Sequence, residues 1–187
     1  MPRPGLLIAL WKKLGNNGTK WKIIANFVTK RESIIMSRVS FLGDYTAKVD
    51  DKGRVVFPSQ HKSRMPEGAD MTFVLHKSIY SPCLEMFTLE EWESQTESVK
   101  AKLDFFNEQH AEFWDAYLQG SAFVTPDPKL GRILIPKELQ EEAGLTKEVV
   151  FAGRDFKIEI WDKDAFESSR MSKDRYKEIA RGLSQTR

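Results

Sequence analysis

The hydrophobic positions of this chain form short runs of apolar and β-branched residues, separated by turn-forming residues. One such turn, Asp-Asp-Lys-Gly at 50–53, has a glycine able to adopt positive φ and an apolar run on either side. Runs of this length and composition are typical of β-strands. Strands are predicted at residues 45–49, 54–57, 72–76, 84–87, 148–152 and 157–161.

These runs belong to an internal repeat. Residues 51–58 (DKGRVVFP) align with 129–136 (KLGRILIP), and both contain Gly-Arg, three apolar residues and Pro at an offset of 78. Downstream, residues 85–92 align with 159–166 at an offset of 74. Two anchors with slightly different offsets indicate two copies of one structural unit that differ in one connection.

Each copy is predicted to contain a hairpin, a short helix, a second hairpin and an exit helix. In the second copy, Pro136 opens the short helix and Gly144 suits its C-terminal end. Thr88 and Glu91 have the spacing of a capping box, which predicts the start of the first exit helix. Asp162 is the corresponding N-cap in the second copy.

The segment between the copies, residues 89–118, has helical character with an interruption near Asp104. Its aromatic residues recur at helical spacing, which predicts a stripe that packs against the two units. Residues 168–187 are polar and are expected to form a short helix with a frayed end. The stripe comprises Phe106, His110, Phe113, Trp114 and Tyr117.

Several motifs, in order, resemble the MraZ family. They are the segment FLGDY at 41–45, the Asp50-x-x-x-Arg54 turn, LEEW at 89–92 and GRILIP at 131–136. The resemblance covers residues 41–167 and implies two tandem AbrB/SpoVT-like swapped-hairpin units in one chain. It also implies a cytoplasmic, nucleoid-associated protein that assembles into rings and binds repeated promoter sites ahead of the division and cell-wall gene cluster.

The expected fold class is therefore α+β, mostly β. Two tandem AbrB/SpoVT-like swapped-hairpin units would form a pseudo-dimer, with helices between and after them. The expected boundaries are a basic N-terminal extension at 1–40, unit 1 at 41–91, connecting helices at 92–119, unit 2 at 120–166 and a polar tail at 167–187.

The two turns supply the candidate DNA-binding residues. A carboxylate beside a guanidinium holds that planar group in one orientation, ready for a phosphate or a guanine edge. An alternative is that the aspartate only satisfies turn amides and the arginine only covers the strand, and the residues alone leave both interpretations open. The candidate DNA-binding residues are Arg54, Lys52, Arg132, Lys129, Lys48 and Arg64, with Asp50 and Asp127 as the residues that orient the arginines.

The second turn departs from the family pattern. Asp50 precedes Arg54 by four positions, whereas Pro128 lies four positions before Arg132 and Asp127 lies five before it. The second loop therefore has an extra residue or a different pairing, and unequal DNA roles for the two units are expected.

The charge distribution is uneven. Residues 1–35 carry seven basic side chains and one acidic side chain, a net charge of +6. Since the whole chain has a net charge of +2, the remaining residues, the body of the protein, carry a net charge of −4. A body with this charge is expected to bind DNA weakly as a monomer. A ring would present many copies to repeated sites, and the high effective concentration of binding units would raise the overall affinity. Residues 1–35 would be either a DNA-binding arm or upstream sequence, and we favour translation from Met36, five residues ahead of Phe41.

The sequence contains no catalytic pattern, so neither an enzyme nor a cofactor, metal or small-molecule substrate is expected. His61, His76 and His110 lack metal-ligand spacing, and Cys83 has no C-x-x-C partner. Cys83 is expected to be a packed structural thiol. No apolar run approaches the ~18 residues that a membrane span requires, and a cytoplasmic location is expected.

Two other functions compete with DNA-dependent regulation. An AbrB-like antitoxin would need a long, extended, acidic C-terminal segment, but residues 168–187 carry six basic and two acidic side chains. A ring-forming scaffold without DNA affinity is the second rival. The predicted partners are double-stranded DNA and further copies of the same chain.

Overall fold

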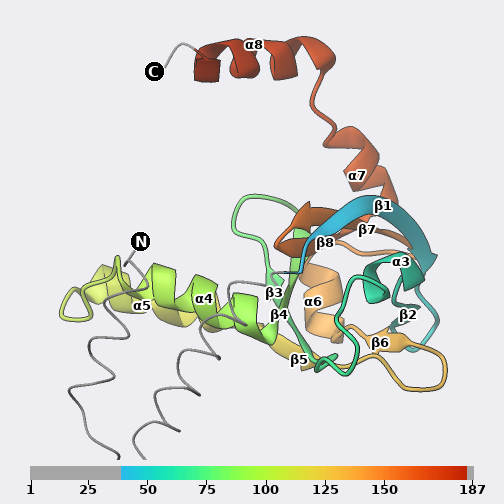
Figure 1. The fold of residues 1–187 in the computed structure, drawn as a ribbon. Coiled ribbons are helices and arrows are strands. Elements are labelled where there is room, and N and C mark those ends of the chain that lie inside the picture. The colour runs from blue at the N-terminus through green and yellow to red at the C-terminus, as the bar shows by residue number, and fades with distance from the viewer. Residues whose placement is uncertain (1–38, 185–187) are drawn as a thin grey trace, which may run out of the picture. The chain divides into compact units, whose positions relative to one another are not determined.

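The computed structural model describes residues 39–184 (Figure 1), so the predictions for residues 1–35 and for Met36 concern residues outside this range. None of the helices in 39–184 is long and apolar enough to span a membrane. The elements are β1 (Phe41–Lys48), β2 (Arg54–Val56), α3 (Ser59–Lys62), β3 (Phe73–Lys77), β4 (Cys83–Thr88), α4 (Leu89–Lys100), α5 (Glu108–Leu118), β5 (Ala122–Val124), β6 (Arg132–Leu134), α6 (Lys137–Glu142), β7 (Glu148–Asp155), β8 (Lys157–Asp162), α7 (Lys163–Ser168) and α8 (Lys173–Ser184).

The strands form a six-stranded antiparallel sheet and a separate two-stranded ribbon. The sheet has the order β1-β7-β8-β4-β3-β5, and the ribbon pairs β2 with β6. By their place in the repeat, β1 to β4 correspond to β5 to β8. Replacing each strand by its counterpart gives the same strand order, read from the opposite edge of the sheet. The two copies therefore occupy equivalent positions in the sheet.

The predicted first hairpin is wrong in its pairing. The turn at 50–53 forms, but β1 pairs along all eight residues with β7 of the other copy, and β2 pairs with β6. Only an isolated bridge, Val49 to Val55, joins the two sides of the turn. Pairing between the copies gives β1 a full ladder of backbone hydrogen bonds, which a hairpin with the three-residue β2 could not provide.

The helices make up more of the fold than the sequence predicts, so the fold is mixed α+β rather than mostly β. Within residues 39–184 the three longest helices, α4, α5 and α8, contain 12, 11 and 12 residues. Helix starts and ends agree with the predicted capping residues. The Thr88 Oγ1 accepts from the Glu91 amide at 3.3 Å, Asp162 accepts from the first amides of α7, and Gly144 has φ +61° after α6.

Residues of both copies build one hydrophobic core. Phe57, the residue after β2, packs against Phe73 of β3 and Phe151 of β7, with ring centroids 5.3 and 6.1 Å apart. Val55 and Ile133, which face each other across the ribbon, belong to the same buried cluster. The copies therefore share their hydrophobic interior, and neither is expected to fold without the other.

Helices α4 and α5 lie side by side (Figure 1), and the segment 101–107 between them is the predicted interruption. The ring of Tyr117 stacks on that of Trp92 in α4, with 5.9 Å between the ring centroids, and its centroid lies 4.5 Å from that of the His76 ring. The prediction that the whole stripe packs against both units is wrong. Phe106 is 103% exposed and Phe113 is 41% exposed, because α5 packs on α4 and on the first copy only at its Trp114 and Tyr117 side.

The glycines of the two turns provide a matched pair for a stability test. Gly53 has φ +75° and Gly131 has φ +62°, so an alanine at either site costs about 1–2 kcal/mol through its backbone conformation. A Cβ on Gly53 would also clash with the Gln140 side chain, whereas a Cβ on Gly131 meets nothing within 4 Å. In urea denaturation, Gly53→Ala is expected to lower the free energy of unfolding more than Gly131→Ala. Equal losses would show that the Gln140 contact is unimportant.

Two buried histidines predict a pH-dependent stability. His61 and His76 are 0% and 3% exposed, and burial lowers the pKa of both rings below the ordinary value of 6.5. Below pH 6.5 the unfolded chain therefore binds more protons than the folded chain. Stability is fully present above pH 6.5 and falls as the pH drops, by up to about 1.4 kcal/mol per pH unit for each histidine.

Urea denaturation between pH 7.5 and 5.5 measures this effect. The variant His61→Gln retains a donor for the Phe151 carbonyl, which lies 3.4 Å from Nε2 in the wild type. It is expected to lose about half of the pH dependence, and adding His76→Gln is expected to flatten the remainder. A wild-type stability that does not change over this range would contradict the prediction.

Candidate nucleic-acid interface

The carboxylate of Asp50 makes several hydrogen bonds within the first turn. Asp50 Oδ1 accepts from the backbone amides of Lys52 and Arg54 at 3.0 and 2.9 Å. Its Oδ2 accepts from Arg54 Nε at 2.8 Å and lies 2.7 Å from Arg54 Nη2. Asp50 therefore plays both roles considered from the sequence. It satisfies amides of the turn, and it orients the Arg54 guanidinium through two nitrogens.

The second turn has the same backbone plan with one additional residue. The Asp50 amide donates to the Arg54 carbonyl at 2.8 Å, and the Asp127 amide donates to the Arg132 carbonyl at the same distance. Asp127 is therefore the counterpart of Asp50. Its carboxylate accepts from three backbone amides, those of Lys129, Leu130 and Arg132, at 2.7–3.1 Å.

The ribbon brings the two arginines onto one surface. Arg54 pairs with Leu134 and Val56 pairs with Arg132, while Val55 and Ile133 between them point inward and are buried. Because side chains alternate along a strand, Arg54, Val56, Arg132 and Leu134 share the outward face. On that face Val56 is 50% exposed and Leu134 is 57% exposed.

Both guanidinium groups lie near Asp50. Arg132 Nη1 is 3.7 Å from Asp50 Oδ2, the oxygen that also contacts Arg54. The hydrogen bonds from Arg54 lower the pKa of Asp50 to about 2, so this carboxylate stays ionised at every physiological pH. Asp127 was expected to orient Arg132, but it bonds the Arg132 backbone amide, and the guanidinium of Arg132 faces Asp50 instead.

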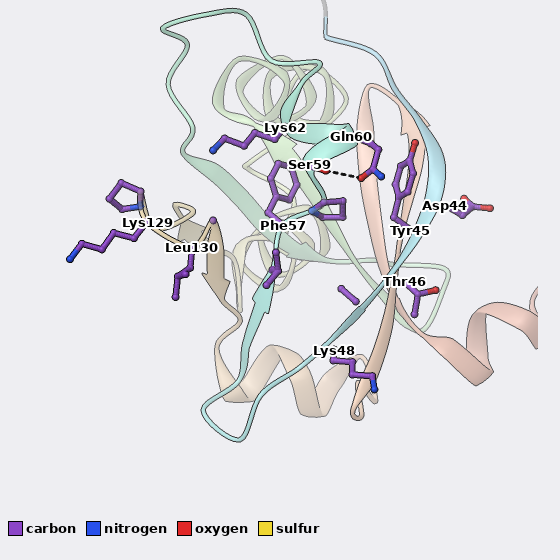
Figure 2. Close-up of a pocket in the computed structure, with 15 residues that line it drawn as sticks. Asp44, Tyr45, Thr46, Lys48, Phe57, Ser59, Gln60, Lys62, Lys129 and Leu130 are labelled. Carbon is purple, nitrogen blue, oxygen red and sulfur yellow. Dashed lines mark hydrogen bonds between the residues drawn. The ribbon is translucent and has the colours of Figure 1, made fainter.

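Lysines surround a pocket beside the ribbon (Figure 2). The pocket has a volume of about 770 Å³ and is lined by residues of β1, the start of α3 and the second turn. Lys48, Lys62 and Lys129 belong to its lining, and all three are exposed. Lys62 was not among the sequence candidates, because a single lysine on a four-residue helix has no pattern that distinguishes it from a solvated one.

The remaining candidates lie in different places. Lys52 is exposed at the tip of the first turn, two residues from Arg54. Arg64 follows α3, where its Nε donates to the Ser40 carbonyl at 3.4 Å, and it is not part of the pocket lining. Arg64 therefore lies outside both the pocket lining and the ribbon.

Comparison with known proteins identifies the family. The family model described as "MraZ protein, putative antitoxin-like" matches residues 40–115 and 117–178. The chain belongs to the MraZ family. Proteins named Transcriptional regulator MraZ are similar to it: the one from Acetivibrio thermocellus is 41% identical over 68% of this chain and 85% of its own length. Those from Flavobacterium psychrophilum and Bacteroides fragilis are 34% and 33% identical, over 70% and 69% of this chain and 82% and 81% of their own lengths.

The two MraZ family segments each contain one of the turns. The first includes Asp50 and Arg54, and the second includes Asp127 and Arg132. Each matched segment therefore contributes one arginine to the outward face of the ribbon.

The buried thiol provides no alternative chemistry. Cys83 is 1% exposed, and burial raises its pKa to about 12, so the reactive thiolate is scarce at neutral pH. It packs in a small cluster with Val150, Trp161 and Phe166, as the structural interpretation predicted. Within residues 39–184, no three histidine, cysteine or acidic side chains gather as a metal site.

Proposed function

We propose that this chain is a sequence-specific, DNA-binding transcriptional regulator, located in the cytoplasm and associated with the nucleoid. It acts as a ring-shaped homo-oligomer on repeated promoter sites ahead of the division and cell-wall gene cluster. The observation that carries the proposal is the outward face of the β2–β6 ribbon, where Arg54 and Arg132 lie close to one ionised carboxylate. The names of the MraZ relatives support the regulatory role.

The two copies are proposed to form an intramolecular swapped-hairpin pseudo-dimer, each an AbrB/SpoVT-like unit. The pairing of β1 with β7, of β5 with β3 and of β2 with β6 supports this arrangement. A pseudo-twofold ribbon would offer one arginine from each copy to the same stretch of duplex. The proposed units are 41–91 and 120–166, joined by 92–119 and followed by 167–187.

A two-stranded ribbon fits the width of the DNA major groove. With the ribbon in the major groove, Arg54 and Arg132 meet guanine edges, each through two parallel N–H groups. Because Asp50 already holds the Arg54 guanidinium in one orientation, Arg54 loses less conformational entropy on binding. The exposed Val56 and Leu134 contact thymine methyl groups beside them. Specificity then comes from four side chains on one narrow face.

Lysines around the ribbon are proposed to anchor the backbone of the DNA. Lys52 at the turn, and Lys48, Lys62 and Lys129 at the pocket, are placed to meet phosphates. Arg64 is a weaker candidate, because it lies outside the pocket lining and its Nε contacts the Ser40 carbonyl. Few cations per chain give modest affinity, and a ring that engages several repeated sites at once would multiply that affinity through effective concentration.

Two rivals predict different outcomes. An antitoxin needs an extended acidic tail, but residues 173–184 form helix α8, with four basic and two acidic side chains. A ring-forming scaffold would assemble but would leave DNA unbound. The helical, basic character of α8 disfavours the antitoxin. A DNA-binding assay distinguishes the scaffold from a DNA-binding regulator.

The test is an electrophoretic mobility shift with the promoter upstream of the gene, repeated across a range of salt concentrations. Binding is expected, with the logarithm of affinity falling linearly with the logarithm of salt, at a slope near −0.9 for each phosphate contacted. A duplex of the same length with scrambled sequence is the control. Absence of a shift would reject the proposal, and a salt-independent shift would reject the phosphate contacts.

A further inference from the structure

The two ends of the β2–β6 ribbon differ in what covers the adjacent turn. At one end, the start of α6 lies beside the first turn, and at the other, the start of α3 lies beside the second turn. At the first of these ends, Gln140 Nε2 donates to the Ile135 carbonyl at 2.6 Å. The Gln140 side chain also lies directly against Gly53, so it fills the space between helix and turn.

Lys62 has the position of Gln140 in the other copy. The offset of 78 aligns these two residues, and the residues before them, His61 and Leu139, are both buried, at 0% and 1% exposed. Lys62 is exposed and does not cover the second turn, since a Cβ on Gly131 would meet nothing within 4 Å. This end of the ribbon therefore keeps an open pocket of about 770 Å³, with a cation where the other end has a neutral amide.

The pocket has a cationic rim, formed by the exposed Lys48, Lys62 and Lys129 (Figure 2). Within residues 39–184, these lysines take part in one ion pair, in which Lys48 Nζ lies 4.0 Å from Glu148. Among the described residues that line the pocket, Asp44 alone is acidic, and its carboxylate accepts from Arg154 Nη1 at 3.1 Å. The rim is therefore suited to an anion.

The lining between the lysines is largely apolar. Val56 and Leu130 are 50% and 58% exposed, and Pro58 also belongs to the lining. Ser59 and Gln60 add polar groups, and their side chains are joined by a hydrogen bond of 3.2 Å (Figure 2). Pockets of ~300–1,000 Å³ that combine apolar walls with a few polar groups bind small organic molecules. The ligand that fits this lining and this rim is an organic anion with a ring system.

We propose that this pocket binds a free nucleoside diphosphate, as a ligand that undergoes no chemical change. The lysines hold the diphosphate, the base lies against Val56 and Leu130, and Ser59 and Gln60 meet the ribose hydroxyls. A nucleotide within a DNA strand has related chemistry, but its phosphate has one negative charge, whereas a terminal phosphate is close to doubly charged at neutral pH. A diphosphate thus brings more charge to one pocket than a DNA phosphate does.

Binding of the nucleotide would compete with binding of DNA. Val56 and the three lysines are the side chains that the proposed function assigns to thymine methyl groups and to phosphates. A nucleotide in the pocket covers them, so it would release the chain from its promoter. This competition rests on the proposed function, whereas the binding of the nucleotide itself does not.

Titration calorimetry with the full chain, without DNA and at constant ionic strength, measures the binding of ADP. The wild type is expected to bind ADP at least about tenfold more tightly than adenosine, which lacks the charge. It is also expected to bind ADP at least about tenfold more tightly than pyrophosphate, which lacks the ring that the apolar lining accommodates.

Lys62→Gln gives the pocket the residue that stands at the other end of the ribbon. This variant removes one charge from the rim and is expected to bind ADP about tenfold more weakly. The matched control is Lys137→Gln, which removes the same charge from an exposed lysine of α6 that is not part of the lining. The control should bind ADP as the wild type does. Both lysines are exposed, so folding should be unaffected.

Fluorescence anisotropy of a labelled promoter duplex, at the same ionic strength, measures the competition. ADP is expected to displace the duplex from the wild type at lower concentration than pyrophosphate does. Three results would overturn the inference: ADP that binds no more tightly than adenosine or pyrophosphate, Lys62→Gln that binds ADP as the wild type does, or bound ADP that leaves the DNA complex intact.

The two measurements also keep this inference apart from the proposed function. If ADP does not bind and Lys62→Gln weakens DNA binding, the pocket serves DNA alone, which rejects the nucleotide and leaves the proposed function standing. ADP binding that depends on Lys62, in a chain that leaves DNA unbound, would support the nucleotide site and reject the proposed function.

Discussion

Replacing Arg54 and Arg132 together with alanine is expected to remove specific DNA binding. Each arginine that reads a base edge contributes about 1–3 kcal/mol, so the double variant should lose about 2–6 kcal/mol if the effects add. The single change Arg54→Ala should cost more than Arg132→Ala. Asp50 contacts Arg54 through two nitrogens at 2.7 and 2.8 Å but lies 3.7 Å from Arg132, so Arg54 is the better oriented group.

Mobility shifts on the promoter duplex and on its scrambled version measure these losses. Arg170→Ala is the matched control, because this exposed arginine lies between α7 and α8, over the Phe166 ring, and is not part of the pocket lining. The control should change affinity little. If the double variant still assembles and binds the promoter as the wild type does, the ribbon is not the reading surface. An equal loss on both duplexes would mean that the arginines contact only phosphates.

The second large effect is on stability. Phe57→Ala is expected to lower the free energy of unfolding by about 3–5 kcal/mol, because it leaves a cavity in a packed core. Phe57 is 3% exposed and its ring contacts Phe73 of its own copy and Phe151 of the other. The loss should therefore affect both copies together, and urea denaturation should retain a single transition with a lower midpoint.

Phe123→Ala serves as the control for this change, since Phe123 is 74% exposed on the edge strand β5 and should contribute little to stability. Fluorescence and circular dichroism should report the same transition in both variants. Two separated transitions in Phe57→Ala would show that the copies unfold independently, which would contradict a shared core.

Much of the candidate site could be predicted from local sequence. The spacing of Asp50 and Arg54 in a glycine-containing turn indicated a carboxylate–guanidinium pair, and the pair forms. The position of Asp127, five residues before Arg132, indicated an altered second turn, and the turn is one residue longer. These features depend on residues within five positions of each other, where spacing along the chain limits the possible contacts.

The position of Lys62 and the proximity of Arg132 to Asp50 could not be predicted in this way. Arg132 and Asp50 are 82 positions apart, and they meet only because β2 pairs with β6. Lys62 joins Lys48 and Lys129 at one pocket because α3, β1 and the second turn converge there. No local pattern encodes such a meeting of distant segments.

The sequence by itself determined the internal repeat, the strands, the turns, the helix caps and the family resemblance, because each of these depends on short-range periodicity or on motif order. The second hairpin of each copy, β3–β4 and β7–β8, pairs as the sequence predicts, whereas the tertiary structure decided the partners of β1 and β2. The turn at 50–53 predicts a local hairpin, yet β1 pairs with β7 and β2 with β6. Pairing between the copies allows the buried faces of both to close over one core, and the free energy of that burial outweighs the local preference of a tight turn.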